Sequence, residues 1–185
     1  EDSDEQFDPT SAPLEQVFGP GQKPWLAVVN THGRDIHVGA WRMMVGRVPV
    51  YFLDTNLEEN DPQDRDLASK LYAGGPDLRL RQEWILGVGG VRVLRAVGIE
   101  PRAWHANEGH AAFMLVERVR ELVLSGMDFE EATRRVRATS VFTTHTPVPA
   151  GHDAFMVDQV AKCTGPIWEE MKVSQEKVLD IGRHP

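Results

Sequence analysis

The sequence predicts a mixed α/β fold in which a β-meander precedes a parallel sheet covered by helices. Two observations lead to this fold class. Three β-rich runs, residues 25–30, 35–45 and 47–56, follow one another with glycine-containing turns between them. Further along the chain, helical and strand patterns alternate, which is typical of parallel strands joined by helices.

The composition is that of an ordinary globular protein. The chain has 185 residues, of which 41% are hydrophobic and 26% charged, enough for one domain with a sizeable core. Its net charge of −8 argues against nucleic acid and anionic membranes as partners. The apolar runs are too short to cross a bilayer. Because Cys163 is the single cysteine, we expect no disulfide and a reducing, cytoplasmic location.

Residues 1–24 form a lead-in that is acidic and then rich in proline and glycine. We expect it to be mostly irregular, with some structure around Leu14 to Phe18. The sequence starts at Glu1 and shows no signal-like segment. We therefore expect that its start has been removed or that it is a piece of a longer protein. Organised structure is expected from Trp25 onward.

A long helix is predicted after the meander. A short helix over residues 65–72 should come first, and Asp77 should cap the long one, which continues to about Val97 and ends before Gly98. Its apolar stripe comprises Leu80, Trp84, Val88, Val91 and Leu94. The glycines of LGVGGVR lie inside this pattern, with no strand before them, so they do not form a phosphate loop. We expect Gly87, Gly89 and Gly90 to allow close packing against the sheet.

Two strands of the second half end in polar stretches. The predicted strands are residues 101–107 and 140–145, with a helix from Gly109 and another from Asp128 to Ala138 between them. A further helix should run from near Phe155 to Gly165. Ligands bind beyond the carboxyl ends of parallel strands. The stretches HANEGH and TTHTPVPAGHD are therefore the candidate sites.

HANEGH, residues 105–110, allows three interpretations. A metal site is disfavoured, because the helical zinc motif needs two histidines four residues apart and these are five apart. Asn107 and Glu108 could cap the following helix. A site for a sugar-like molecule explains all the polar residues, since imidazole, amide and carboxylate groups bind hydroxyls. We prefer this third interpretation and expect no metal.

TTHTPVPAGHD, residues 143–153, follows the second strand. Its prolines remove backbone donors and fix φ, so we expect a shaped loop that holds His145. An ordinary loop with exposed histidines is an equally good interpretation of these residues. Cys163, in a partly apolar helical context, is expected to be structural.

Three separated stretches resemble the α-glucan (glycogen, starch or maltodextrin) phosphorylases, especially their shorter bacterial and archaeal branch. They are the run from Tyr51 to Pro101, WHANEGHAAFMLVERVREL and VFTTHTPVPAGHDAF. The resemblance covers about Lys23 to Pro185. It implies that residues 25–185 are part of the N-terminal Rossmann-like lobe of a two-lobed GT-B type glycosyltransferase.

The resemblance also implies an activity. Members of this family transfer a glucosyl unit from an α-1,4-glucan to inorganic phosphate and release α-glucose 1-phosphate. Their pyridoxal phosphate forms a Schiff base with a lysine of the C-terminal lobe, and no stretch of this sequence matches that lysine segment. We therefore expect the cofactor to be bound by a lobe absent here, and this fragment alone to be inactive. The full-length protein could be a homo-oligomer.

The resemblance assigns candidate site residues one by one. His145 matches the histidine that contacts the 6-hydroxyl of the transferred glucosyl unit. Glu108 and His110 match the acidic residue and the histidine that line the same cleft, where the longer phosphorylases carry NDTH. Asn107 would order the turn before them. A further set, Gly74, Gly75 and Asp77, matches the loop that gates the cleft in the longer enzymes.

Two other functions remain open at this point. The chain could be a lobe of a related GT-B enzyme, such as a glycogen synthase, which needs no pyridoxal phosphate. It could also act alone as a carbohydrate-binding module. A pyridoxal-lysine motif elsewhere in the reading frame would favour a phosphorylase, and a glucan-affinity measurement would test the binding module.

Overall fold

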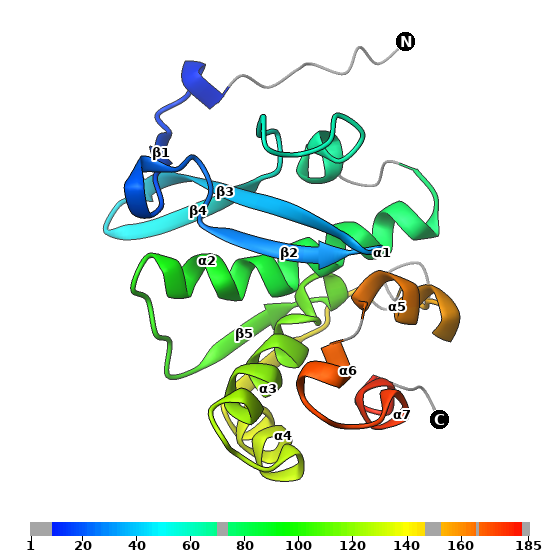
Figure 1. Cartoon of the computed structure of the whole chain (residues 1–185). Coiled ribbons are helices and arrows are strands. Elements are labelled where there is room, and N and C mark those ends of the chain that lie inside the picture. Colours follow the sequence, from blue (N-terminus) through cyan, green and yellow to red (C-terminus); the bar gives the residue numbers. More distant parts are fainter. Residues whose placement is uncertain (1–8, 70–73, 147–152, 166, 183–185) are drawn as a thin grey trace.

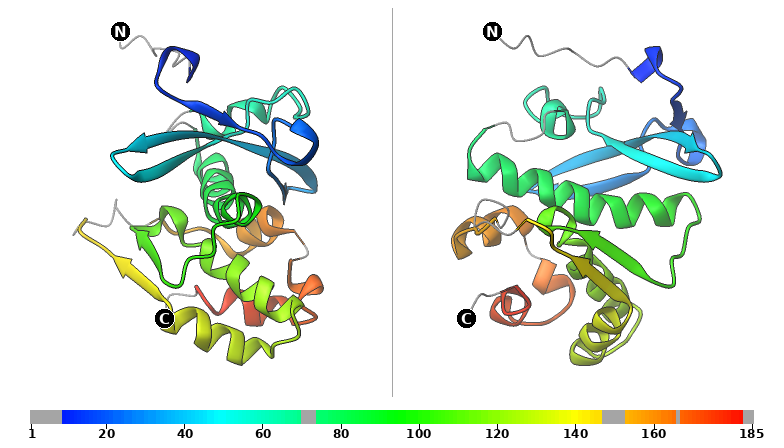
Figure 2. Two further views of the ribbon diagram at one scale, coloured as in Figure 1. Left: turned by 90° about the vertical axis from the view of Figure 1, so that its left-hand side faces the viewer. Right: turned by 180° about the vertical axis from the view of Figure 1, so that it is seen from behind.

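The structure is a computed structural model that describes residues 9–69, 74–146, 153–165 and 167–182. Two β-sheets lie on either side of a long helical segment (Figure 1). Seen end-on, this segment separates the antiparallel sheet from the parallel strands and their helices (Figure 2). The mixed α/β class predicted from the sequence is therefore confirmed.

The first sheet is antiparallel and contains the predicted meander. Its strands are β2 (Ala27–Thr31), β3 (Arg34–Val45) and β4 (Val48–Asp54), each paired with the next. A fourth strand, β1 (Glu15–Val17), pairs with β3 and lies where the lead-in was expected to hold some structure. Two short 3₁₀ turns, η1 (Pro9–Ser11) and η2 (Pro20–Gln22), flank it.

The long helix is one unbroken run of three segments. They are α1 (Pro76–Trp84), the π-helical turn η4 (Ile85–Gly89) and α2 (Gly90–Ala96). Four members of the predicted stripe are buried, namely Leu80, Trp84, Val88 and Val91. The run ends at Gly98, whose φ is 77°. The apolar pattern thus located this helix correctly, because one face of it covers the first sheet.

The start of this helix differs from the expectation. Gly75 is the N-cap, Pro76 is the first helical residue, and no side chain caps the helix. Proline suits that position because its missing N–H would have no helical partner there. The prediction that Asp77 is the cap is therefore wrong. Of the short helix expected at 65–72, the structure has the 3₁₀ turn η3 (Arg65–Ala68), and residues 70–73 lie outside the described part.

The second sheet is parallel, as the alternation of elements predicted. Its strands β5 (Trp104–Asn107) and β6 (Ser140–Thr143) pair from Trp104↔Ser140 to Asn107↔Thr143. The connection between them contains the 3₁₀ turn η5 (Gly109–Ala111), α3 (Met114–Leu124) and α4 (Phe129–Ala138). Asp128 caps α4 as predicted, accepting hydrogen bonds from the N–H groups of Glu130 and Glu131.

A buried ion pair joins these layers. Glu117 of α3 is 1% exposed, and its two carboxylate oxygens accept hydrogen bonds from the guanidinium of Arg92 at 2.7 and 2.9 Å. The same guanidinium donates to the carbonyl oxygen of Val28 in β2 at 2.6 Å. A bidentate pair of this kind fixes orientation as well as distance. It therefore fixes the position and orientation of α3 relative to α2 and the first sheet.

Three helices follow in the C-terminal part, α5 (Val157–Thr164), α6 (Ile167–Glu170) and α7 (Gln175–Leu179). Cys163 of α5 is fully buried 3.4 Å from Oγ1 of Thr31, and burial raises the pKa of its thiol to about 11. This agrees with a structural role. None of the described helices has the length and apolar character needed to span a membrane.

Gly87 lies at a very close approach between helices. A Cβ added there would be 2.7 Å from the backbone N of Met114 and 2.8 Å from Cβ of Phe113. The glycines were expected to pack against the sheet, and Gly89 faces it, because a Cβ added there would lie 3.6 Å from the side chains of Val29 and Val38. Gly87 instead admits the start of α3, whereas a Cβ on Gly90 would meet nothing within 4 Å.

We predict that Gly87→Ala destabilises the protein and that Gly90→Ala does not. Overpacking of a tight contact costs about 1–3 kcal/mol, which exceeds the gain of about 1 kcal/mol from replacing glycine in a helix. Gly90→Ala introduces no close contact and gains only helix propensity, so the free energy of unfolding of this variant should rise slightly. Urea denaturation of both variants checks this pair. Equal effects of the two substitutions would contradict the close approach at Gly87.

Candidate functional site

The carboxyl ends of β5 and β6 bring the two polar stretches side by side. Asn107 pairs in register with Thr143, and the N–H of Glu108 donates to the carbonyl oxygen of Thr143 at 2.8 Å. Nε2 of His105 lies 2.7 Å from Oγ1 of Thr143. The parallel ladder thus continues to the first residues of both stretches, and HANEGH and TTHT share one edge of the sheet.

Glu108 connects the two stretches. Its Oε1 accepts hydrogen bonds from the backbone N–H groups of His145, at 2.8 Å, and Thr146, at 2.9 Å. Nδ1 of His145 lies 3.1 Å from the same oxygen. Glu108 is 6% exposed, and its Oε2 is buried without a hydrogen-bond partner in the described ranges. The N–H of His145 is the main cause that lowers the pKa of Glu108 to about 2, against the opposing effect of burial.

The backbone of Glu108 is strained. Its φ of 60° and ψ of −174° fall in a region that is almost restricted to glycine. Such a conformation costs about 1–3 kcal/mol and persists only where surrounding contacts hold it. The side chain of Glu108 caps no helix, so the helix-cap interpretation of HANEGH is not supported for this residue.

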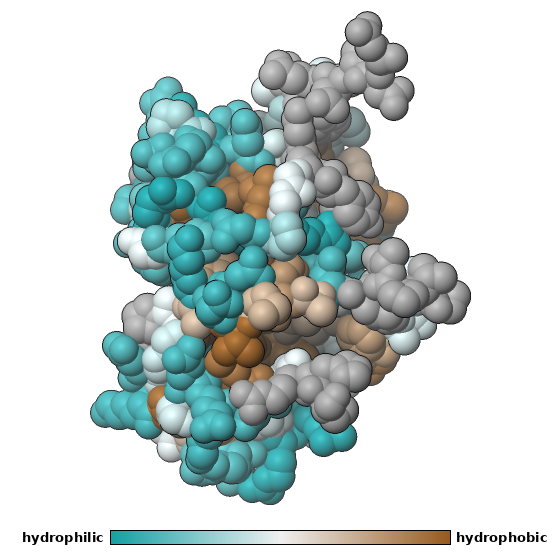
Figure 3. Space-filling model, turned by 90° about the vertical axis from the view of Figure 1, so that its right-hand side faces the viewer, coloured by the Kyte–Doolittle hydropathy of each residue, from teal (hydrophilic) through white to brown (hydrophobic). Residues whose placement is uncertain are grey.

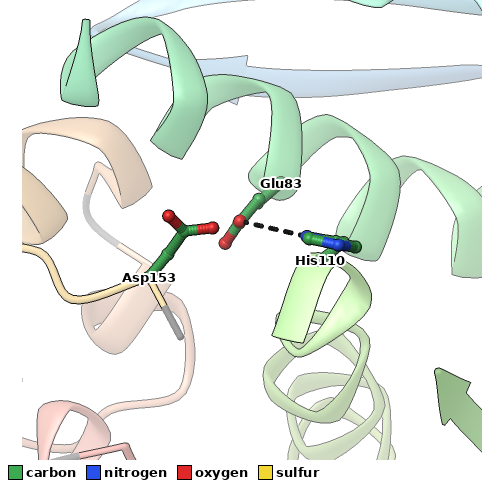
Figure 4. Close-up of side chains that lie close together, drawn as sticks. All are labelled: Glu83, His110 and Asp153. Atoms are coloured by element: carbon green, nitrogen blue, oxygen red, sulfur yellow. Dashed lines mark ion pairs between the residues drawn. The ribbon is translucent and has the colours of Figure 1, made fainter. Parts of the chain in front are cut away.

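His110 lies in a second polar cluster, in which Arg79 of α1 is central. The guanidinium of Arg79 is 2.8 Å from Nδ1 of His110, 3.2 Å from Oε1 of Glu83 and 3.0 Å from Oδ2 of Asp153. Because a guanidinium nitrogen only donates, Nδ1 of His110 accepts and the ring proton is on Nε2. Figure 4 shows how Glu83, His110 and Asp153 point toward one another.

The cluster has a donor set that could hold a metal ion. Ligand atoms of Glu83, His110 and Asp153 all lie within 4.8 Å of one another. The guanidinium of Arg79, however, contacts all three side chains and already supplies a positive charge among them. The arrangement in the described residues is that of a hydrogen-bonded polar cluster centred on arginine.

Glu83 and Asp153 titrate in opposite directions. Burial is the main cause that raises the pKa of Glu83 to about 8, and the neighbouring Asp153 adds to the rise. Burial also acts to raise the pKa of Asp153, but hydrogen bonds with Glu83 and Arg79 lower it. Near neutral pH, Glu83 is therefore protonated and Asp153 carries the one negative charge of the pair. The carboxylate of Asp153 accepts hydrogen bonds from the guanidinium of Arg79.

The other sequence-predicted residues are placed less centrally. Asn107 is exposed at the end of β5. Gly74, with φ of 80°, and the N-cap Gly75 directly precede α1. Oδ1 of Asp77 lies 3.4 Å from Nε2 of His32. The structure therefore brings Glu108 and His145 together, whereas Asp77 contacts the β2–β3 turn instead.

Sequence reasoning missed Arg79, Glu83 and the role of Asp153. A signal for the first two was present, because an arginine and a glutamate four residues apart share one face of a helix. That face lies beside the predicted apolar stripe, where charged residues need partners. Nothing in the spacing indicated that Asp153 would join them.

We predict that Glu83→Gln changes how stability depends on pH. The pKa of Glu83 is about 8 in the folded chain and near 4.5 in the unfolded chain. Between these values the folded state binds more protons, so the free energy of unfolding falls as pH rises from about 5 to about 8. Glu83→Gln removes this decline and should be more stable than the parent above pH 8.

Denaturant titrations across that pH range measure the effect. Glu59→Gln, at an exposed position, is the control for the loss of one carboxylate. A decline of the same size in Glu83→Gln as in the parent would show that Glu83 is ionised at neutral pH.

Comparison with known proteins agrees with the resemblance of the three motifs. The chain is 39% identical over 178 residues to the maltodextrin phosphorylase of Thermococcus litoralis, an alignment covering 96% of this chain and 21% of that protein. It is 41% identical over 163 residues to the glycogen phosphorylase of Mycobacterium tuberculosis, covering 84% of this chain and 19% of that protein. With the glycogen phosphorylase of Aquifex aeolicus the identity is 32% over all 185 residues, or 27% of that protein.

No family model matches the chain. The chain spans 19–27% of the length of these curated relatives. Two of the alignments nevertheless cover at least 96% of the chain. The chain therefore corresponds, over nearly its whole length, to a segment of the glycogen and maltodextrin phosphorylases.

Proposed function

We propose that the chain is part of an α-1,4-glucan phosphorylase that transfers a glucosyl unit to inorganic phosphate and forms α-glucose 1-phosphate. One observation supports this most strongly. Glu108 and His145, from two motifs that resemble this family, meet at the carboxyl ends of two paired parallel strands. Edges of this kind bind ligands in parallel α/β sheets. The names of the relatives support the same reaction class.

We further propose that residues 25–185 form part of the N-terminal Rossmann-like lobe of a GT-B enzyme. The parallel pair β5–β6 with its intervening helices suits such a lobe. Parallel sheets are normally covered on both faces, yet Val141 and Phe142 of β6 are 57% and 55% exposed. Apolar residues also form a patch on the side seen in Figure 3. These exposed apolar side chains favour packing against further protein.

Recognition of the sugar in this proposal depends on hydrogen bonds at the strand ends. His145, whose side chain is 63% exposed, would contact the 6-hydroxyl of the transferred glucosyl unit. His110 and Glu108 would line the same cleft, with Asn107 beside them. Gly74, Gly75 and Asp77 would belong to a gating loop. A neutral polyol needs such donors and acceptors and no basic surface, which suits a net charge of −8.

The cofactor of the proposed enzyme is pyridoxal phosphate, which would supply its phosphate group to proton transfer. The described part of this chain does not fit that group. Its four lysines, Lys23, Lys162, Lys172 and Lys177, all have exposed side chains, whereas a Schiff-base lysine needs an enclosed pocket. We therefore assign the cofactor to the C-terminal lobe of the complete enzyme. That enzyme would act on α-glucan and phosphate in the cytoplasm, and could be a homo-oligomer.

We predict that the purified 185-residue chain releases no glucose 1-phosphate from maltodextrin and phosphate. The reason is that none of the described lysines can hold the cofactor that the proposed reaction needs. A coupled assay for glucose 1-phosphate, with pyridoxal phosphate added, measures this. A complete phosphorylase assayed in parallel is the positive control. Turnover by the chain alone would overturn the proposed division between the lobes.

We predict that His145→Ala in the complete enzyme lowers kcat/KM with glucans. Loss of one hydrogen bond to the 6-hydroxyl costs about 1–3 kcal/mol, or about ten- to a hundredfold in rate. A xylosyl donor lacks the hydroxymethyl group, so its turnover should fall much less. Comparing both donors separates this contact from general damage.

A thermal melt accompanies that comparison. His145 is largely exposed, so the melting temperature should stay near that of the parent. An equal proportional loss with both donors, or a large drop in melting temperature, would show that His145 is structural.

A further inference from the structure

We infer that Glu108 is a positioning residue that acts through His145, by holding the backbone and the ring of His145 with a single carboxylate oxygen. This inference rests on the proposed function for its catalytic consequence. Its structural part concerns contacts within this chain. Three independent features of Glu108 support it, namely its contacts, its burial and its backbone conformation.

The contacts of Glu108 converge on the residue that follows β6. Two consecutive backbone N–H groups, of His145 and Thr146, donate to Oε1, and Nδ1 of His145 is 3.1 Å from the same atom. The two N–H groups fix the path of the chain where it leaves the sheet. Contact with Nδ1 favours the tautomer that carries its proton on that nitrogen, so that Nε2 faces away from Glu108.

Low exposure of Glu108 to water strengthens this attachment. Glu108 is 6% exposed, so water competes little for its oxygen. Hydrogen bonds from the two N–H groups keep the carboxylate ionised at all ordinary pH values, since the pKa is about 2. The acceptor is therefore always present, and the position of His145 should not vary with pH through Glu108.

The backbone conformation of Glu108 supports a role for its carboxylate. Glycine would adopt φ of 60° with ψ of −174° without strain, and Gly109 is the next residue. The chain nevertheless has glutamate at the strained position. A side chain that is kept in a conformation suited to glycine must supply a contact that outweighs the strain, and the contact observed is the one to His145 and Thr146.

Three substitutions separate the carboxylate from the strain. Glu108→Gln retains an acceptor oxygen, Glu108→Ala removes it and retains the strain, and Glu108→Gly removes both. In the isolated chain, amide hydrogen exchange at His145 and Thr146 should remain slow in Glu108→Gln. It should rise by up to about tenfold in the other two variants, because each of these amides loses one hydrogen bond and such a bond contributes up to about a factor of ten.

Exchange at Ala132 is the internal control. This residue is fully buried, and its N–H donates to the carbonyl oxygen of Asp128 at 2.8 Å. Its exchange should be unchanged in all three variants. A rise at Ala132 equal to that at His145 would mean general loosening of the fold and would overturn the inference. Unchanged exchange at His145 and Thr146 in both Glu108→Ala and Glu108→Gly would overturn it as well.

Imidazole nitrogen chemical shifts of His145 provide a second readout. The parent and Glu108→Gln should show the proton on Nδ1, and Glu108→Ala should shift toward the tautomer protonated on Nε2. The same tautomer distribution in the parent and in Glu108→Ala would overturn the role assigned to the ring contact.

Catalysis tests the inference in the complete enzyme. If Glu108 acts only through His145, the double variant Glu108→Ala/His145→Ala should have the same kcat/KM as His145→Ala, within about threefold. If Oε2 of Glu108 contacts the sugar directly, the two losses should multiply, and the positioning role would be overturned. An inactive parent enzyme would contradict the proposed function alone, since the exchange and tautomer results would still stand or fall separately.

Discussion

The close approach of the long helix to the start of α3 is the constraint on which the candidate site depends. Gly87 lets the backbone at Phe113 and Met114 come within van der Waals distance of the helix. Three residues before that contact lies His110, and five before it lies Glu108. The bidentate pair of Arg92 with Glu117 attaches α3 to the same long helix at a second point. Pairing of β5 with β6 holds the start of the loop after β5, and these two contacts of α3 hold its end, so the polar residues of the loop have little freedom of position.

Two glutamates near the strand ends show how environment decides charge. Glu108 is surrounded by N–H donors, which stabilise the ionised form and keep its pKa near 2. For Glu83, burial is the main cause that raises the pKa to about 8, and the neighbouring carboxylate of Asp153 adds to the rise. Arg79 compensates only one of the two negative charges that Glu83 and Asp153 would carry. The candidate site thus contains one ionised carboxylate, on Glu108, and one carboxyl pair, Glu83 with Asp153, that holds a proton near neutral pH.

The fold could be predicted largely from the sequence because its elements carry strong local patterns. The meander, the stripe of the long helix, the Asp128 cap and the two parallel strands were all expected where they occur. The local sequence pattern gave the wrong start for α1: Asp77 was predicted as the N-cap, but Pro76 is the first helical residue and Gly75 is the N-cap. It also could not show that Gly87 packs against α3, because that contact depends on how two distant segments meet.

The site was predictable only in part, for a related physical reason. Histidine and glutamate at strand ends indicated where a ligand could bind, and their order in the chain placed them at one edge of the sheet. What each side chain does depends on contacts between residues far apart in the chain, such as Glu108 with His145 and Arg79 with Asp153. A sequence shows that a glutamate precedes a glycine in NEGH. Only the structure shows that the strained residue is the glutamate, and that its carboxylate holds the other strand end in place.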